Sequence, residues 1–526
     1  MTEATRNPER LKATVGYILS RGAELHPDRI AVDDLLNGRR LTYRELDGRA
    51  NRLARALARQ GVGRGDIVAT MLWNEHAIVE TLFACARIGA IFAPLNVRLR
   101  AADVADYLDG RDCAAIVTSA DFGDRFADVP AGIPIARGGG DGWLDFEALL
   151  DAEEAGPLAA DIPFDEPYRL VGTGGTTGRS KGVLHSHVGT LFTVLADIAE
   201  FGIRRGWKTF SVLPAYHVAG MEWGMLTVLW RCGTVVFPAK TSFDAKHFLD
   251  EVRARAIEYL PLVPAVIGPL HAAWDGEPLT DVRVVVSTAA PTPLALREKL
   301  AEMFPGAELI AAAGLSESLN MAAQSPGEFL THPAGIGEPH VDTRVLILDD
   351  DDREVPRGTP GHVAQRNFNT ALCYLGDPEA SAATWRPRKG DAEGLHWCFT
   401  GDIGVMDDDG RLTIVDRSKD VVKTGGESVP SVEVESVYAG HPALSDCAVV
   451  GIEDAQWGEA IVLVAVAADP SADWEALAAE LYRFGRDNLA GFKVPKRIAF
   501  LDALPRSHFG KVLKRDLRAF PFERFY

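Results

Sequence analysis

The sequence predicts an α/β fold in which a large N-terminal lobe of layered α/β subdomains and a small β-rich subdomain precede a small α+β C-terminal domain. Three observations support this prediction. The chain has 526 residues, more than one hydrophobic core usually organises. Segments with helical spacing of apolar residues alternate with short apolar strands, and this alternation gives way to short strands and turns before a compact final segment.

The N-terminal lobe is predicted from repeated pairs of a helix and a strand, which favour largely parallel sheets. The expected helices lie at 50–57, 77–88, 101–108 and 245–255, and the strands that follow them lie at 67–72, 90–93, 114–117 and 259–263. The glycine-rich stretch 138–142 is expected to be a surface loop.

Two further regions follow. Short strands at 344–348, 362–365 and 412–415, separated by turns, predict the β-rich subdomain. Strands at 446–451 and 461–467 and a helix at 474–489 predict the C-terminal domain. We therefore divide the chain into residues 1–418 and 419–526.

The charge balance argues against two classes of partner. The formal net charge of −19 opposes nonspecific binding to nucleic acid or to an anionic membrane. No run of residues approaches the roughly 18 uncharged apolar residues of a membrane span. The last 36 residues are an exception to the acidic trend, with nine Lys and Arg against three Asp and Glu, which fits either a solvated basic end or a phosphate-bearing ligand.

The cysteines indicate a reducing compartment. There are six, dispersed and without a C-x-x-C pair, so neither a disulfide framework nor a zinc site is expected. The first ten residues are polar and contain no apolar segment of a signal peptide. Together these features predict a cytoplasmic protein.

The most informative segment is the loop 172–182, which follows the apolar Leu170-Val171. Glycines let backbone N–H groups converge on an anion, hydroxyls add donors, and Lys181 supplies a positive charge, which is chemistry suited to a polyphosphate. The pattern is not that of a P-loop, because Gly182 and not Ser or Thr follows Lys181. A flexible linker would not explain why hydroxyls cluster with one lysine.

This loop resembles the phosphate-binding signature of the acyl-adenylate-forming superfamily, which comprises acyl-CoA synthetases, nonribosomal peptide synthetase adenylation domains and luciferases. Other segments resemble the family's motifs in the same order: 214–220 with its P-x-x-H-x-x-G, 314–317 with its G-x-T-E, 400–402 with its T-G-D, 416–420 and 425–427 with its hinge region, and 505–511 with its C-terminal lysine motif. The resemblance spans nearly the whole chain, and it implies that the C-terminal domain is mobile.

The resemblance implies a site for ATP and Mg²⁺. Glu317 and Thr176 are expected at the metal and Ser316 at a phosphate, while Asp402 and Arg417 are expected to contact the ribose. The residues expected to bind the phosphates are Thr173, Gly174, Gly175, Thr176, Thr177, Gly178 and Lys181.

The resemblance also implies the catalytic groups and the acceptor site. Lys511 would contact the substrate carboxylate and the α-phosphate, with His217 and Glu317 as the other catalytic residues. Lys419 would be the hinge about which the C-terminal domain rotates, after which Gly425 and Gly426 would leave room for the arm of coenzyme A. The expected acyl pocket is lined by His217, Thr288, Ala289, Ala290, Ala311, Ala312 and Ala313.

The chain departs from the family's usual residues at several positions. These are Gly172 and Gly174 in place of Tyr and Ser, Ser180 in place of Pro, Thr288-Ala289 in place of Gly-Gly, and Ala313 in place of an aromatic residue that stacks on adenine. The last change removes an aromatic contact of about 1 kcal/mol, which predicts either weaker ATP binding or a compensating side chain. Because Lys181, Glu317, Asp402 and Lys511 are all present, the resemblance favours a working enzyme.

We therefore expect an ATP-dependent carboxylic acid–CoA ligase, which forms an acyl-AMP and pyrophosphate and then an acyl-CoA and AMP. The small side chains of the expected acyl pocket are compatible with a bulky or ring-containing acid. Two alternatives stay open at this point: an enzyme that loads the acyl group onto a carrier protein, and a degenerate nucleotide-binding regulatory protein.

Overall fold

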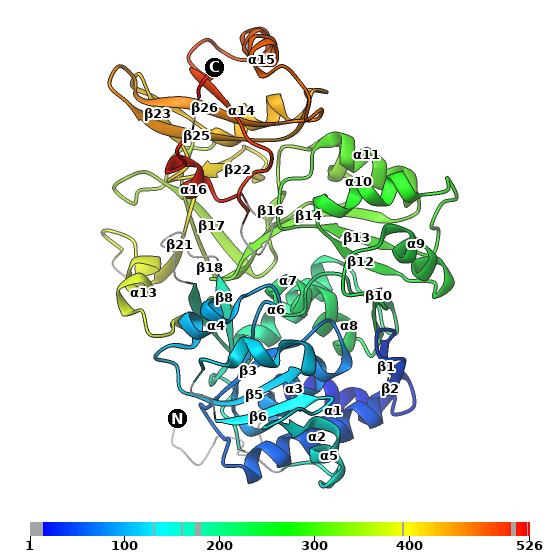
Figure 1. Cartoon of the computed structure of the whole chain (residues 1–526). Helices are drawn as coiled ribbons and strands as arrows, with labels where there is room; N and C mark the ends of the chain where they lie inside the picture. Colours follow the sequence, from blue (N-terminus) through cyan, green and yellow to red (C-terminus); the bar gives the residue numbers. More distant parts are fainter. Residues whose placement is uncertain are drawn as a thin grey trace.

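Two large, mostly parallel sheets form the N-terminal lobe (Figure 1). The computed structural model describes residues 14–129, 132–158, 161–173, 180–391, 394–506, 512–522 and 524–526. The nine-stranded sheet has the order β16 (Glu338–Pro339), β15 (Leu319–Ala323), β14 (Glu308–Leu315), β13 (Val284–Ser287), β12 (Tyr259–Leu262), β10 (Lys208–Phe210), β11 (Thr234–Phe237), β1 (Ile30–Asp34) and β2 (Arg39–Thr42). Its strands from β14 to β1 are parallel, and its edges are antiparallel.

The eight-stranded sheet carries the predicted phosphate loop. Its order is β19 (Cys373–Tyr374), β9 (Lys181–Ser186), β8 (Pro167–Thr173), β4 (Ile91–Pro94), β3 (Ile67–Met71), β5 (Cys113–Ser119), β6 (Ile133–Arg137) and β7 (Leu144–Asp145). Strands β8 to β7 are parallel, whereas β9 and β19 add an antiparallel edge. The predicted parallel α/β lobe is thus confirmed.

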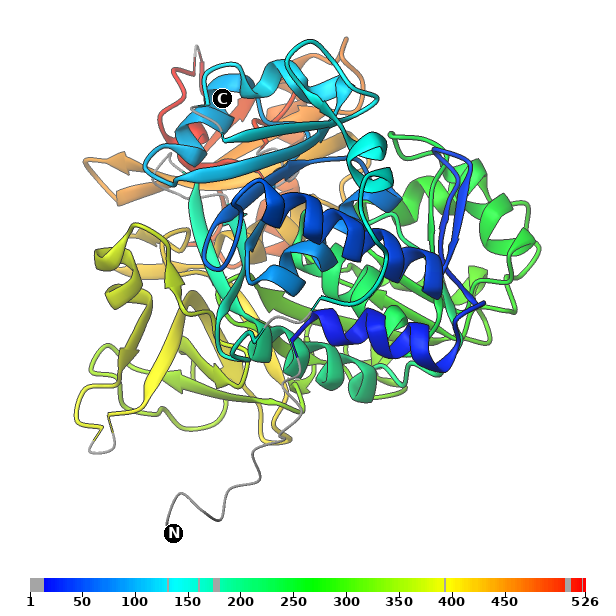
Figure 2. The ribbon, with the colours of Figure 1, turned by 90° about the horizontal axis from the view of Figure 1, so that it is seen from below.

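Helices cover these sheets. Their bounds are α1 (Gly16–Leu25), α2 (Tyr43–Arg59), α3 (His76–Ile88), α4 (Ala101–Leu108), the 3₁₀ helix η2 (Ala120–Phe126), α5 (Phe146–Asp151), α6 (His187–Glu200), α7 (Val218–Met221), the π-helical turn η3 (Glu222–Leu226), α8 (Thr227–Trp230), α9 (Ala245–Ala254), α10 (Pro264–Ala273), α11 (Leu294–Met303) and α12 (Glu328–Thr331). The largest apolar core combines α1, α2 and α3 with residues of both sheets, so the lobe folds around a shared interior (Figure 2).

Local sequence explains where α2 begins. The expected helix started at residue 50, whereas the structure starts it at Tyr43. The Thr42 hydroxyl accepts a hydrogen bond from Glu45 N at 3.2 Å, and the Glu45 carboxylate accepts one from Thr42 N at 2.8 Å. This capping box satisfies two backbone donors and sets the start of the helix before its apolar periodicity begins.

Two smaller sheets complete the chain. The β-rich subdomain contains β17 (Thr343–Leu348), β18 (Gly361–Asn367), β21 (His396–Met406), β20 (Trp385–Pro387) and β22 (Leu412–Arg417), with α13 (Pro378–Thr384) beside it. The C-terminal sheet contains β24 (Glu427–Val429), β23 (Val422–Thr424), β26 (Gly458–Ala467), β25 (Leu444–Asp454) and β27 (Arg497–Phe500), with α14 (Ser431–Tyr438), α15 (Trp474–Asn488) and α16 (Lys514–Arg518). Both regions lie where the sequence predicted them.

The cysteines and the loop 138–142 also agree with the sequence analysis. All six cysteines are free thiols, four of them buried. The loop joins β6 to β7, with Gly138, Gly139, Gly140 and Gly142 at positive φ. Across the described ranges, no helix combines the length and the apolar character needed to cross a membrane.

Candidate active site

The predicted phosphate loop connects the two strands of a hairpin. Strands β8 and β9 are antiparallel, and Thr173 pairs with Lys181 at the end where the loop begins. Ser180 Oγ donates a hydrogen bond to Thr173 O at 2.6 Å and so ties the two ends together. The expected phosphate-binding residues Gly174, Gly175, Thr176, Thr177 and Gly178 lie outside the described residues.

A tyrosine connects Lys181 to Glu317. Lys181 Nζ lies 4.7 Å from the centre of the Tyr374 ring and 4.0 Å from Asp377 Oδ2. Tyr374 OH donates a hydrogen bond to Glu317 Oε1 at 2.8 Å. Burial and the nearby Glu317 carboxylate raise the pKa of Tyr374, which keeps its phenol protonated as a donor. The structure thus brings together two residues predicted for phosphate and metal.

Sequence analysis missed Tyr374. Its place is set by β19, which pairs with β9 so that Tyr374 lies opposite Val183, two residues beyond Lys181. The only local signal is an aromatic residue in a short apolar run before Asp377, the N-cap of α13. That signal does not reveal pairing with a strand almost 200 residues earlier in the chain.

The predicted metal residue Glu317 lies in the turn between β14 and β15, next to Ser316. Glu317 O accepts hydrogen bonds from Ala371 N at 3.0 Å and from Trp385 Nε1 at 3.3 Å. The Ser316 backbone also lies beside the buried His185, whose pKa burial lowers well below its usual value. Backbone contacts therefore hold this turn in place, and the Glu317 carboxylate accepts its hydrogen bond from Tyr374.

The two residues expected at the ribose are direct partners. Asp402 and Arg417 lie opposite each other on β21 and β22, and Arg417 Nε is 2.8 Å from Asp402 Oδ1. Asp402 is buried, whereas the Arg417 side chain is 46% exposed. A carboxylate held this way is preoriented to accept hydrogen bonds from a diol.

The expected acyl wall is formed by two adjacent strand ends. Strands β13 and β14 are parallel with Ser287 opposite Ala311, so Thr288, Ala289 and Ala290 follow β13 beside Ala311, Ala312 and Ala313. Ala289 has φ of +70°, in the left-handed region that favours glycine, where a non-glycine residue is strained. His217 is the N-cap residue of α7, and its ring lies 5.3 Å from that of Tyr216.

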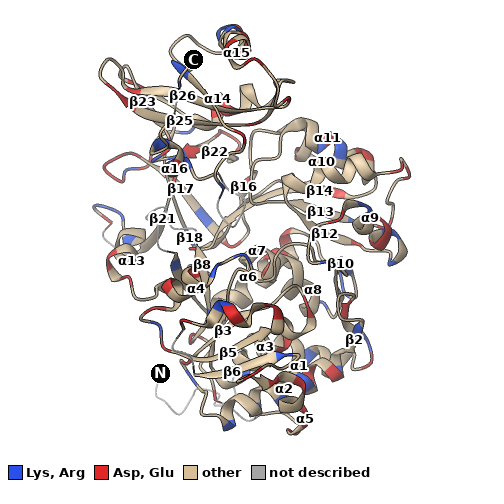
Figure 3. Ribbon diagram, viewed as in Figure 1, with Lys and Arg blue, Asp and Glu red and all other residues tan. Residues whose placement is uncertain are grey.

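The predicted hinge contains a buried aspartate. Asp416, at the end of β22, accepts hydrogen bonds from Ser431 N at 2.5 Å and from Ser431 Oγ at 2.6 Å. Lys514 Nζ donates to the same Ser431 hydroxyl, and Arg518 pairs with Asp420 at 2.7 Å. The basic residues of α16 thus gather at this junction (Figure 3).

The predicted hinge residue Lys419 is partly buried among cations. Burial and the positive charges of Arg417, Arg518 and Arg515 lower the pKa of Lys419. Gly425 and Gly426 form the turn between β23 and β24 with φ of +60° and +85°, which gives both glycines a conformational role in the hairpin. The predicted catalytic residue Lys511 lies outside the described residues.

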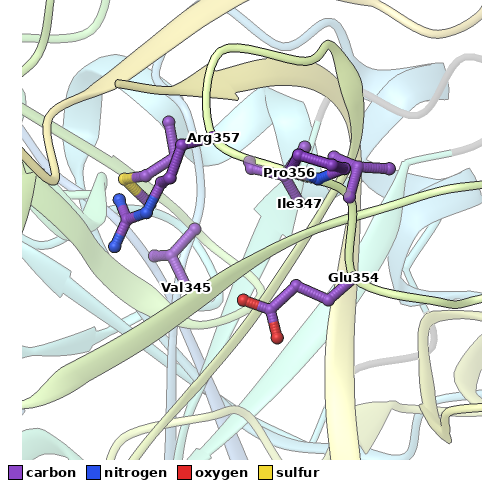
Figure 4. A pocket seen from close by; sticks show the side chains of 7 residues that line it. Val345, Ile347, Glu354, Pro356 and Arg357 are labelled. Atoms are coloured by element: carbon purple, nitrogen blue, oxygen red, sulfur yellow. The ribbon is translucent and has the colours of Figure 1, made fainter. Parts of the chain in front are cut away.

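A separate hollow lies in the β-rich subdomain (Figure 4). Its lining comes from β17, β21 and the turn that contains Glu354 and Arg357, and it includes none of the predicted site residues. The candidate active site is therefore defined by the paired groups above and not by this hollow.

The expected nucleotide-binding residues thus adjoin the β8–β9 hairpin, and the expected acyl-pocket residues adjoin the ends of β13 and β14. The chain belongs to the AMP-binding enzyme family, whose model matches residues 19–375. The model of the AMP-binding enzyme C-terminal domain matches residues 433–511. These matches confirm the resemblance drawn from the motifs.

Curated relatives match almost the full chain. A feruloyl-CoA synthase from Amycolatopsis is 31% identical, with 95% of this chain and 97% of the relative covered. An indoleacetate–CoA ligase from Aromatoleum aromaticum is 31% identical, with 95% and 96% covered. A fatty acid–[acyl-carrier-protein] ligase from Streptomyces coeruleorubidus is 32% identical, with 92% of each chain covered.

Solved structures agree with the fold. The o-succinylbenzoate CoA synthetase of Bacillus subtilis, in complex with its acyl-adenylate intermediate, superimposes with a TM-score of 0.85 at 25% identity, covering 96% of this chain and 99% of that one. ATP-bound MatB from Rhodopseudomonas palustris gives 0.83 at 25% identity, with 96% and 99% covered. The predicted class, an AMP-forming acid–CoA ligase, is confirmed, and the chain is an enzyme.

Proposed function

We propose that this enzyme activates a ring-containing carboxylic acid with ATP and Mg²⁺ and transfers the acyl group to coenzyme A. In the first half-reaction a carboxylate oxygen attacks the α-phosphorus, and the bond to pyrophosphate breaks. In the second, the thiol sulfur attacks the acyl carbon, the thiol proton is lost, and AMP leaves. The observation that carries this proposal is the chain of contacts from Lys181 through Tyr374 to Glu317.

The charged groups fit the first half-reaction. Two anions must approach each other, so the site needs cations and donors aimed at the phosphates. Lys181 supplies one cation beside the phosphate hairpin, and Ser316 offers a hydroxyl next to Glu317. Asp402, oriented by Arg417, is proposed to accept the ribose hydroxyls.

The metal site is proposed at Glu317 and Thr176. Mg²⁺ would neutralise phosphate charge and is usually bound by one or two carboxylates together with phosphate oxygens and water. Among the residues that the structure describes, no group of three or more His, Cys, Asp or Glu side chains could hold a metal ion. A single carboxylate oriented by Tyr374 fits an ion that enters with the nucleotide.

The C-terminal domain is proposed to comprise residues 419–526 and to rotate about Lys419. Lys511 would serve adenylation, and the turn at Gly425 and Gly426 would face the thiol after rotation. The Asp416–Ser431 hydrogen bonds lie across this junction and support a defined orientation of the domain. The basic residues of α16 supply positive charge for the phosphates of coenzyme A.

The small side chains after β13 and along β14 support a ring-containing acid. Relatives named for feruloyl, indoleacetate and 2-succinylbenzoate substrates support the same class. A second candidate acceptor is a carrier protein, because one relative is named as a fatty acid–[acyl-carrier-protein] ligase. Thioester formation with free coenzyme A as the sole thiol separates the two acceptors.

The test is carboxylate-dependent ATP–pyrophosphate exchange with linear, aromatic and polycyclic acids, with and without Mg²⁺. Exchange that requires a ring-containing acid and Mg²⁺ supports the proposal, and exchange with linear acids alone contradicts the substrate class. Lys511→Ala should reduce adenylation by about 100-fold or more while a supplied acyl-AMP still reacts with coenzyme A. Equal loss of both half-reactions would contradict rotation about Lys419.

A further inference from the structure

A group of buried polar side chains lies on elements that adjoin the proposed acyl wall. Helix α7 starts directly after His217 and runs into the π-helical turn η3, which begins at Glu222. Asn320 lies on β15 opposite Gly314, the residue that follows Ala313 of the acyl wall. The fully buried Asp197 lies on α6, which packs on η3. Turns of π-helix frequently mark functional sites.

Asp197 has unused hydrogen-bonding capacity. Its side chain is completely buried, and neither carboxylate oxygen accepts a hydrogen bond of ordinary geometry. Its nearest cationic neighbour is His340, whose Nε2 is 3.5 Å from Asp197 Oδ1 without forming a hydrogen bond. Asn320 approaches Asp197 closely enough to oppose the effect of burial on its pKa, yet Asn320 Nδ2 also completes no hydrogen bond.

The neighbouring ion pair is incomplete as well. Arg169, fully buried on β8, pairs through one guanidinium nitrogen with Glu222 Oε1. Glu222 Oε2 and the Arg169 nitrogens Nε and Nη2 have no hydrogen-bond partner. Glu222 lies on η3, which packs on the helix that carries Asp197, and its carboxylate contributes to raising the pKa of Asp197.

Such unsatisfied groups are expensive to bury, and native proteins pair nearly all of them with protein or water. This cluster contains acceptors on Asp197 and Glu222 and donors on Asn320 and Arg169. A partner that both donates and accepts would therefore complete it. Asn320 lies on the strand beside the expected acyl wall, and Glu222 lies five residues after His217, so the cluster adjoins elements that carry the expected acyl pocket.

We propose that the substrate acid carries a hydroxyl group remote from its carboxylate, and that Asp197, Glu222 and Asn320 bind this hydroxyl. The inference rests on the proposed acid-activating function and specifies its substrate class. A second carboxylate in place of the hydroxyl would lie against the carboxyl groups of Asp197 and Glu222. An ammonium group would lie against the N–H donors of Arg169 and Asn320. Neither therefore matches the cluster as well as a hydroxyl, which both donates and accepts. Burial raises the pKa of Asp197 well above its usual value, which favours a neutral group beside it.

The test compares matched pairs of acids in ATP–pyrophosphate exchange with the full-length enzyme. The probes are 3-(4-hydroxyphenyl)propanoate with 3-phenylpropanoate, trans-4-hydroxycyclohexanecarboxylate with cyclohexanecarboxylate, and 6-hydroxyhexanoate with hexanoate. The corresponding ω-amino acids and dicarboxylates are included. At least one hydroxylated acid should exceed its deoxy partner by about tenfold or more in kcat/KM, because a site built to hydrogen-bond a hydroxyl rejects the analogue that lacks it.

Two substitutions test which side chains distinguish a hydroxylated acid from its deoxy partner. Asp197→Leu and Asn320→Leu remove the hydrogen-bonding groups and keep the branching of the side chain at Cγ, and each should reduce the hydroxyl preference to about threefold or less. Glu298→Gln, at an exposed acidic position of α11, is the control and should keep the wild-type preference. Because the ratio compares two acids on one protein sample, a loss of folded protein affects both acids equally.

The outcomes separate this inference from the proposed function. No exchange with any acid contradicts the proposed function itself. Exchange without a hydroxyl preference in the wild-type enzyme overturns the inference and assigns the cluster to internal water. A preference for the amino acids or the dicarboxylates also overturns it, as does a hydroxyl preference that survives in both Asp197→Leu and Asn320→Leu.

Discussion

Two polar clusters of the N-terminal lobe, one partly and one fully buried, differ in how completely they are paired. We call the first the complete cluster: Asp34, Arg49, His76, Glu80 and Glu147. Every carboxylate oxygen in it accepts a hydrogen bond; for example, Arg49 donates to both oxygens of Glu80 at 2.7 and 3.2 Å. These groups stabilise one another between α2, α3 and α5.

We call the second the incomplete cluster: Asp197, Glu222, Asn320, Arg169 and His340. Several of its polar atoms lack partners although all five side chains are buried. The difference fits the proposal above: the carboxylates of the complete cluster are paired within the protein, whereas the incomplete cluster has donors and acceptors left for a ligand. This contrast yields four predictions about stability and activity.

Arg49→Met should cause the largest effect. It leaves the fully buried Glu80 without its direct ion-pair partner, and breaking a buried ion pair from one side costs about 3–5 kcal/mol. Chemical denaturation of the purified protein measures the change. The double variant Arg49→Met, Glu80→Leu should recover part of the loss, and equal stability of the single variant and the wild type would contradict a structural role.

The pH dependence of stability tests the same cluster. Burial acts to lower the pKa of His76, but hydrogen bonds with Asp34 and Glu147 raise it to about 9. Because the folded pKa exceeds the unfolded value of about 6.5, the contribution is complete below pH 6.5 and is lost as pH rises through 9. The free energy of unfolding should therefore fall by about 2–3 kcal/mol between pH 6.5 and 10.

A control isolates the histidine in this pH series. His76→Gln removes the titrating group and should give a flatter profile across the same pH range, at lower stability near pH 7. An identical slope for His76→Gln and the wild type would assign the pH dependence to other groups.

Much of the fold followed from sequence because its signals are local. The helix at 101–108 was predicted with the bounds that α4 has, and the motif residues Asp402 and Arg417 proved to be paired. Tyr374 and Asp197 were not identified, since their roles depend on strand pairing and on packing between α6 and η3. No local pattern distinguishes a buried carboxyl group that has partners from one that has none.

Tyr374→Phe tests whether the nucleotide end of the site behaves like the complete cluster. The change removes the hydroxyl donor to Glu317 but keeps the ring beside Lys181. A hydrogen bond to a charged group contributes about 1.5–3 kcal/mol, so kcat/KM for ATP–pyrophosphate exchange should fall about tenfold. Tyr482→Phe, at an exposed position of α15, should leave the rate unchanged. A wild-type rate for Tyr374→Phe would show that Glu317 needs no orientation.

Asp197→Leu should have the smallest effect on stability, although it alters a completely buried acidic residue. Replacing a carboxyl group that makes no hydrogen bond of ordinary geometry removes a desolvation cost and only the weak contacts with His340 and Asn320, so the free energy of unfolding should change by less than about 1 kcal/mol or increase. Chemical denaturation of Asp197→Leu and Arg49→Met under the same conditions compares their free energies of unfolding directly. A loss as large as that of Arg49→Met would mean that Asp197 is paired in solution, and the two clusters would then be alike.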